Sequence, residues 1–161
     1  MWHNPTWTKT IYGDEGTQLY NDFEDVKRSI QQVRDNGMQV LLDFHYSDNW
    51  TDPGKNEPPA AWADVTDIDV LKDSVYNYTL KTLQRLASGG LMPEFVQLGN
   101  EINCGMFFTN VSETFPSCNV CDGAWSQLGV VLNAGIKAVR DAAACRRSNL
   151  RSFCTSPIQK M

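Results

Sequence analysis

Residues 38–44 (MQVLLDF) form a short, nearly unbroken apolar run that contains the β-branched Val40. A run of this length and composition predicts a strand buried on both faces, as in a parallel sheet. Residues 22–34, just before it, carry apolar side chains at helical spacing and are followed by Asn36-Gly37, a helix-stop signal. The pattern therefore predicts an amphipathic helix that leads into a buried strand, which is one step of a β/α alternation.

The same alternation continues along the chain. Residues 70–86 have the helical apolar period, Gly89-Gly90 ends that segment, and residues 95–98 (FVQL) form a second short apolar run. A third helix is predicted over residues 124–144. Helices that alternate with strands through short connections predict an α/β fold with a parallel sheet, either an open doubly wound sheet or a closed (β/α)8 barrel. These patterns alone do not choose between the two.

Polar and aromatic side chains follow both predicted strands, where α/β proteins place their functional groups. His45, Asp48 and Trp50 follow the first strand, and Asn100-Glu101 follows the second. A pyranose has hydroxyls at its rim and C–H groups on its faces, so hydrogen-bonding groups beside aromatic rings suit a sugar. A carboxylic acid in a partly apolar pocket can stay protonated and donate to a leaving-group oxygen. The alternatives are a core histidine at position 45 and, for Glu101, a helix-capping role or an ion pair with a basic side chain.

Composition narrows the classes of partner. The 161 residues suit one domain, and the net charge of -5 argues against a nucleic-acid partner, which needs clustered Lys and Arg. No run approaches the roughly 20 apolar residues of a membrane span. The N-terminus of this chain lacks the pattern of a signal peptide. Three sequons, at Asn49, Asn77 and Asn110, would be glycosylation acceptors if the protein enters a secretory pathway.

The chain has five cysteines, so at least one is unpaired unless an intermolecular bond forms. Cys118 and Cys121 have the two-residue spacing of a zinc or redox motif. That spacing is weak support for zinc because no second pair accompanies it. We expect a local disulfide or free thiols at these two positions.

Several blocks of the sequence resemble, in order and spacing, the endo-β-1,4-galactanases of glycoside hydrolase family 53. They are residues 37–48 (GMQVLLDFHYSD), Trp50, residues 52–55 (DPGK), 59–62 (PAAW), 75–79 (VYNYT) and 96–101 (VQLGNE). The resemblance runs from about residue 2 to residue 141 and implies a (β/α)8 barrel that is incomplete at both ends. It predicts a partial catalytic domain over residues 1–141 and a divergent tail over residues 142–161. We expect Met1 to be an internal start and the tail to come from a truncated or misread gene product.

The resemblance also implies roles for single residues. Glu101 matches the acid/base catalyst after the fourth strand, and Asn100 matches the asparagine that contacts the sugar near its 2-hydroxyl. His45 matches a histidine that lines the cleft, and Asn4 falls at the end of the second strand as a further contact. The catalytic nucleophile follows the seventh strand in the family and has no counterpart in this chain. No organic cofactor is implied, and the structural calcium of some relatives has no evident ligand set here.

The implied activity is a secreted endo-hydrolysis of β-1,4-galactosidic bonds in type I arabinogalactan or pectic galactan, with retention of configuration and impaired in this fragment. One alternative is another retaining β-glycanase, such as a mannanase or cellulase, because the Asn-Glu pair after the fourth strand is widely shared on this barrel. A second is a non-catalytic remnant that binds galactan through His45, Trp50 and Asn100 without cutting it. The family-wide blocks favour the galactanase.

Overall fold

The computed structural model describes residues 1, 3, 21–48 and 50–147. The predicted sugar contact Asn4, the predicted glycosylation site Asn49 and residues 148–161 of the predicted tail lie outside the described residues. Within them, no helix is both long and apolar enough to cross a membrane.

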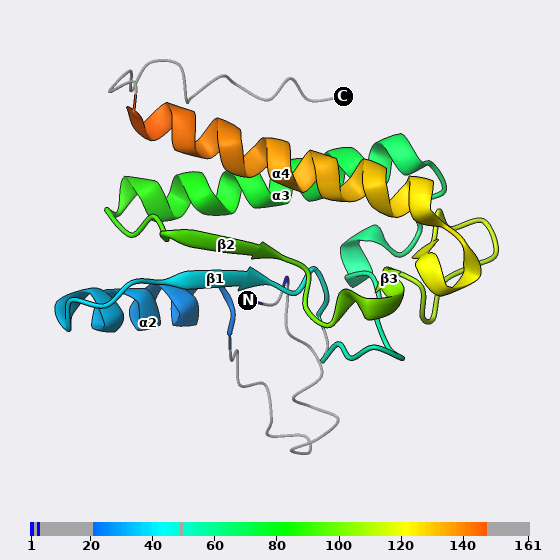
Figure 1. Cartoon of the computed structure of the whole chain (residues 1–161), viewed down its shortest axis with the longest axis horizontal. Helices are drawn as coiled ribbons and strands as arrows, with labels where there is room; N and C mark the ends of the chain where they lie inside the picture. The colour runs from blue at the N-terminus through cyan, green and yellow to red at the C-terminus, as the bar shows by residue number, and fades with distance from the viewer. Residues whose placement is uncertain (2, 4–20, 49, 148–161) are drawn as a thin grey trace.

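Three long helices alternate with two strands, as the apolar patterns predict. In chain order they are α2 (Phe23–Asp35), β1 (Leu41–Phe44), α3 (Ile68–Ser88), β2 (Phe95–Leu98) and α4 (Trp125–Arg147). Figure 1 shows α3 and α4 running together along one side of the strand pair, with α2 beside β1. Helix α4 continues without a break across the predicted domain boundary at residue 141.

Capping side chains determine where two of the helices begin. The carboxylate of Asp22 accepts a hydrogen bond from the backbone N–H of Asp25, and Asp67 does the same for Asp69. Each bond satisfies one of the amides that a helix start leaves without an intrahelical partner. Helix α3 ends at Gly89, where the glycine pair predicted a stop. Local sequence signals are therefore enough to set these boundaries.

The two strands are parallel, with Leu41 opposite Phe95 and Phe44 opposite Leu98. The described residues cover only one face of the pair. Phe44 and Leu42 are buried, whereas Leu41 and Phe95 on the other face are 60% and 55% exposed. The prediction of burial on both faces was wrong for this chain, because the described helices cover one side of the sheet and nothing described covers the other.

The edge of β1 that faces away from β2 also carries hydrogen bonds. The N–H of His45 donates to the carbonyl of Met1, and the N–H of His3 donates to the carbonyl of Ser47, both at 2.9 Å. Met1 and His3 thus lie next to the carboxyl end of β1, as β2 does on the other side of that strand.

Between β2 and α4 the chain forms a compact loop region that the sequence did not predict. It contains a short antiparallel pair, β3 (Gly105–Met106) and β4 (Cys118–Asn119), and a disulfide between Cys104 and Cys121. A disulfide between Cys118 and Cys121 is therefore wrong, whereas the alternative of a free thiol holds for Cys118. Cys118 is a free thiol, and burial raises its pKa to about 12.

Candidate active site

The segments that follow β1 and β2 meet at one edge of the sheet. Because the strands are parallel and Phe44 lies opposite Leu98, both segments begin at the same level. The N–H of Gly99 donates to the carbonyl of Phe44 at 2.9 Å and carries this pairing past the strand end. The positions predicted from the two strand ends, His45 on one side and Asn100-Glu101 on the other, are thereby brought to a common edge.

Glu101 follows β2 in an unusual backbone conformation. Its φ of 52° and ψ of 42° lie in the left-handed region, which costs a residue other than glycine about 1–2 kcal/mol. It precedes a single 3-10 turn (Ile102–Cys104), but its side chain makes no capping hydrogen bond. Within the described part of the chain, its carboxylate forms no ion pair. The capping alternative for Glu101 is therefore not supported, and its carboxylate remains available for chemistry.

A cavity of about 470 Å³ opens around this segment, within the size range of ordinary ligand sites. The residues that line it are Gln97, Leu98, Gly99, Asn100, Glu101, Ile102 and Asn103. Glu101 is exposed there, rather than enclosed by apolar groups as the sequence suggested. The open face of the strand pair explains the difference, since no described segment covers this side.

A buried threonine connects the two strand ends. Thr51 is fully buried, and its hydroxyl lies 3.2 Å from Nδ1 of His45. The same hydroxyl lies 3.4 Å from the carbonyl oxygen of Asn100 and 3.3 Å from its Nδ2. Nδ2 of Asn100 also donates to the carbonyl of Thr51 at 3.4 Å. Sequence reasoning missed Thr51, because nothing local distinguishes it from any polar loop residue.

His45 is partly buried at the rim of this edge. Burial, together with the weaker effect of the nearby α-ammonium of Met1, lowers its pKa to about 4. The ring is consequently neutral at neutral pH. The Trp50 ring lies beside it, with 6.3 Å between ring centroids, and Trp50 is 57% exposed. An exposed indole next to a neutral imidazole offers an apolar platform and a hydrogen-bonding group together.

Asp48 has a different environment from its predicted neighbours. It is only 5% exposed, and its Oδ2 accepts a hydrogen bond from the backbone N–H of Ala60 at 2.9 Å. Its other carboxylate oxygen lies 3.5 Å from Nδ1 of His3. The structure therefore gives Asp48 a part in holding the loop at Ala60, and its role as a sugar contact stays a prediction.

Two of the predicted glycosylation sites are described, and both are exposed. Asn77 lies on α3, and Asn110 follows β3. The side-chain amide of Asn110 donates to Oε1 of Glu57 at 2.6 Å. Glycosylation at Asn77 and Asn110 stays a prediction.

The Cys118-x2-Cys121 motif does not form a zinc site. Zinc needs thiolate ligands, and the sulfur of Cys121 is bonded to Cys104. Across the described ranges, no group of three or more His, Cys, Asp and Glu side chains could hold a metal ion.

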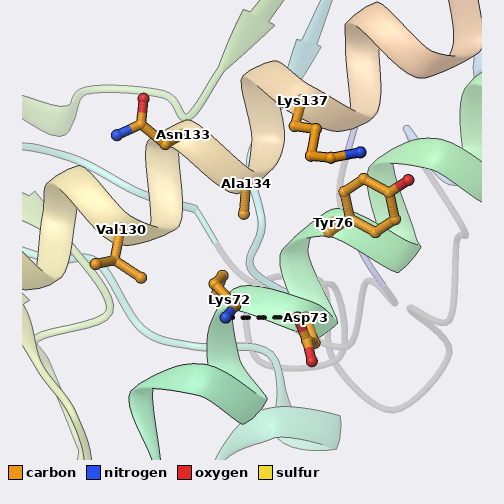
Figure 2. A pocket seen from close by; sticks show the side chains of 7 residues that line it. All are labelled: Lys72, Asp73, Tyr76, Val130, Asn133, Ala134 and Lys137. Atoms are coloured by element: carbon orange, nitrogen blue, oxygen red, sulfur yellow. Dashed lines mark ion pairs between the residues drawn. The ribbon is translucent and has the colours of Figure 1, made fainter.

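A larger hollow of about 640 Å³ lies on the outer side of the fold, between α3 and α4 (Figure 2). Its charged side chains have partners close by: Lys72 pairs with Asp69 and Asp73, and Lys137 pairs with Asp141. The hollow lies on the helix layer and not at the strand ends. It is therefore not the candidate active site.

A parallel β/α layout with an Asn-Glu pair at the carboxyl edge of the strands is typical of the (β/α)8 glycoside hydrolases. The family model of glycosyl hydrolase family 53 matches residues 1–152, so the chain belongs to this family. The resemblance read from the sequence blocks is confirmed.

Proteins similar to this chain carry galactanase names. An arabinogalactan endo-β-1,4-galactanase of Cellvibrio japonicus (strain Ueda107) is 40% identical over 88% of the chain and 34% of its own length. An endo-β-1,4-galactanase of Bacillus subtilis (strain 168) is 33% identical over 88% of the chain and 29% of its own length. The chain therefore spans about a third of the length of the curated relatives it matches.

Solved structures agree with this fold. The GH53 catalytic domain of Ignisphaera aggregans superposes with a TM-score of 0.70 at 31% identity, over 89% of this chain and 36% of that one. A fungal β-1,4-galactanase structure gives a TM-score of 0.68 at 28% identity, over 87% and 36%. The described helices and strands are thus part of a (β/α)8 barrel, as predicted.

Proposed function

We propose that this chain belongs to an arabinogalactan endo-β-1,4-galactanase, which cuts β-1,4-galactosidic bonds within the chain of type I arabinogalactan or pectic galactan. The observation that carries the proposal is the Asn100-Glu101 pair at the carboxyl edge of β2, beside an open cavity of about 470 Å³. The names of the family 53 relatives support galactan as the substrate.

Glu101 acts as the acid/base catalyst in this proposal. It first protonates the glycosidic oxygen as the bond to the anomeric carbon breaks, while a second carboxylate attacks that carbon. Glu101, now ionised, then takes a proton from the water that releases the sugar with retention of configuration. The two carboxyl groups of a retaining enzyme lie about 5 Å apart. By the family resemblance the second one follows the seventh strand, so the complete reaction belongs to the complete barrel.

The neighbouring side chains would bind the substrate. Trp50 offers an exposed ring face for the C–H groups of galactose, and Asn100 and His45 offer hydrogen-bonding groups for its hydroxyls. These three side chains come from the two loops that follow β1 and β2. The site would therefore recognise a sugar by shape and hydroxyl pattern, and it needs no organic cofactor.

We also propose an extracellular role in the breakdown of plant cell-wall polysaccharide. The Cys104–Cys121 disulfide supports an oxidising compartment, where such bonds persist. The test is to alkylate the protein as purified from its host and map the modified cysteines by mass spectrometry. Alkylated Cys104 and Cys121 in unreduced protein would contradict an oxidising compartment.

A panel of polysaccharides tests the proposed substrate. Reducing ends are measured after incubation of the complete barrel that carries this chain with β-1,4-galactan, β-mannan and cellulose. Release from galactan alone supports the proposal, whereas faster release from mannan or cellulose supports another β-glycanase on this barrel.

Galactan binding without cleavage is a second candidate for the isolated chain. It is favoured because Trp50, His45 and Asn100 lie together at the candidate site. Retention on a galactan affinity gel with no release of reducing ends would support this candidate. Failure to be retained would reject it.

A further inference from the structure

The backbone of Glu101 must be held by the chain segments on either side of it. Its φ of 52° and ψ of 42° lie in the left-handed region, where a residue other than glycine stays only if the surrounding structure holds it. The Glu101 side chain makes no capping hydrogen bond and, among the described residues, no ion pair. The side chain itself therefore does not fix this conformation.

The segment before Glu101 is attached to the loop after β1. The N–H of Gly99 donates to the carbonyl of Phe44 at 2.9 Å, and Nδ2 of Asn100 donates to the carbonyl of Thr51 at 3.4 Å. These contacts fix the chain up to Glu101. They do not fix the chain after it.

The segment after Glu101 is a single 3-10 turn that ends at a disulfide. Glu101 directly precedes this turn, Ile102–Cys104, and the N–H of Gly105 donates to the carbonyl of Ile102. The sulfur of Cys104 is bonded to the sulfur of Cys121. The covalent link therefore begins within one turn of the candidate acid.

The other end of the link, Cys121, belongs to the segment that leads into α4. Cys121 lies in the 3-10 turn Val120–Asp122, and its N–H donates to Oδ1 of Asn119 at 3.1 Å. The carbonyl of Asn119 accepts from the N–H of Ala124 at 2.9 Å, directly before α4 begins. Helix α4 packs along α3 (Figure 1). The disulfide thus ties the turn after Glu101 to the helix layer.

The short strands β3 and β4 pair on the far side of this link from Glu101. Gly105 lies opposite Asn119, and Met106 lies opposite Cys118. Both paired residues of β3 follow Cys104 in the chain. The disulfide therefore stands between this pair and Glu101 along the sequence.

We infer that the Cys104–Cys121 disulfide positions Glu101: it fixes the turn after Glu101 to the start of α4 and so holds the carboxyl group where it can protonate the leaving-group oxygen. This inference rests on the proposed function. Proton transfer needs the acid within hydrogen-bond reach of its target, so a small displacement of a catalytic group costs rate.

The test removes the link in the complete barrel that carries this chain. The variant is the double change Cys104→Ser with Cys121→Ser, because Cys104→Ser alone would leave Cys121 free to pair with Cys118, the described free thiol. Loss of a disulfide also lowers global stability. Leu83→Ala is therefore the matched control, since Leu83 is fully buried on α3 and its truncation destabilises the fold without changing the turn.

Two substrates separate the position of the acid from a general loss of structure. Galactan releases a sugar alcohol, which needs the proton of Glu101, whereas 2,4-dinitrophenyl β-1,4-galactobioside releases a phenolate, which leaves without one. We compare the ratio of kcat/KM on galactan to kcat/KM on the aryl substrate. We expect this ratio to fall about tenfold or more in the double variant, as part of the 10²–10⁴-fold contribution of a general acid is lost, and to stay unchanged in Leu83→Ala.

A ratio that is unchanged in the double variant would overturn the inference, whether both activities persist or both fall together through unfolding. Glu101→Gln, measured beside it, separates this failure from failure of the proposed function. If the wild type does not cut galactan, or Glu101→Gln still does, the proposed function fails and the inference fails with it. If Glu101→Gln loses the activity while the double variant keeps the wild-type ratio, only the role of the disulfide is rejected.

Discussion

At the scale of single residues, burial of the His45 ring makes the stability of the chain depend on pH. The pKa of His45 is about 4 in the folded state, against 6.5 for an ordinary histidine. Between these values the unfolded chain binds a proton that the folded chain does not, so the free energy of unfolding rises with pH in this range. Below about pH 4 this contribution is flat.

We therefore predict that the urea midpoint of the wild-type chain increases from pH 4 to pH 6.5 more steeply than that of His45→Gln. The variant keeps a polar side chain but has no group that titrates there. Parallel curves for the two proteins would show that His45 is not held neutral by the fold.

The sequence predicted the residues at the candidate site better than the contacts between them. Glu101, Asn100 and His45 could be proposed because each follows an apolar run that predicts a strand. Thr51 and the buried position of Asp48 were not found. Their roles depend on segments 49 and 12 residues away, which only the folded chain brings together.

At the scale of elements, the two faces of the strand pair differ in what they contribute to stability. Leu42 is 4% exposed and its neighbour Leu41 is 60% exposed. We predict that Leu42→Ala lowers the free energy of unfolding by about 2–5 kcal/mol, as for a buried leucine. The matched change Leu41→Ala should cost about 0.5 kcal/mol or less. Equal losses in chemical denaturation would mean that both faces are covered.

The loop region before α4 depends on a glycine in a backbone conformation that other residues avoid. Gly105 has φ 98° and ψ -152°, and a Cβ there would lie 2.0 Å from the carbonyl oxygen of Cys118. We predict that Gly105→Ala lowers the free energy of unfolding by about 3 kcal/mol or more, because strain and a backbone clash add.

Gly123 is the matched control for this prediction. Its φ is also positive, at 90°, but a Cβ at this position would have no neighbour within 4 Å, so Gly123→Ala should cost only about 1 kcal/mol of backbone strain. Thermal unfolding of both variants measures the difference. If both variants lose a similar amount of unfolding free energy, backbone strain explains the loss, and the close approach to Cys118 does not.

The long elements were predictable and the short ones were not. Helices α2, α3 and α4 have apolar side chains at helical spacing. Both parallel strands are short apolar runs. Strands β3 and β4 have two residues each, too few to show a period, and their pairing is stabilised by the Cys104–Cys121 disulfide that encloses it. Cysteine spacing left a local disulfide and free thiols open at Cys118 and Cys121, and it did not point to Cys104 as the partner of Cys121.

At the scale of the whole molecule, the chain is about a third of a family 53 barrel, and its candidate site lies on the edge that this third provides. The loop after β1 is attached to the loop after β2 by Asn56, which is fully buried. Its Oδ1 accepts from the N–H of Phe107, and its carbonyl accepts from the N–H of Phe108. The two loops that carry the site are thereby held as one unit.

This arrangement explains why the fold could be recognised from so short a piece. A β/α repeat contains its own helix–strand packing, so the described elements adopt the family geometry over most of the chain. The uncovered face of β1 and β2 could not be read from the sequence. An apolar strand has the same pattern whether its second face is covered by this chain or by other segments of a barrel.

The central claim is that Glu101 is the proton donor of a galactan-cleaving site. The direct measurement is reducing-end release from β-1,4-galactan by the complete barrel that carries this chain, as wild type, Glu101→Gln and the control Glu113→Gln, with galactan binding measured in parallel. We predict that Glu101→Gln keeps binding but loses hydrolysis by about 10²–10⁴-fold, because the amide cannot donate the proton, and that Glu113→Gln matches the wild type. Hydrolysis that survives in Glu101→Gln would contradict this account.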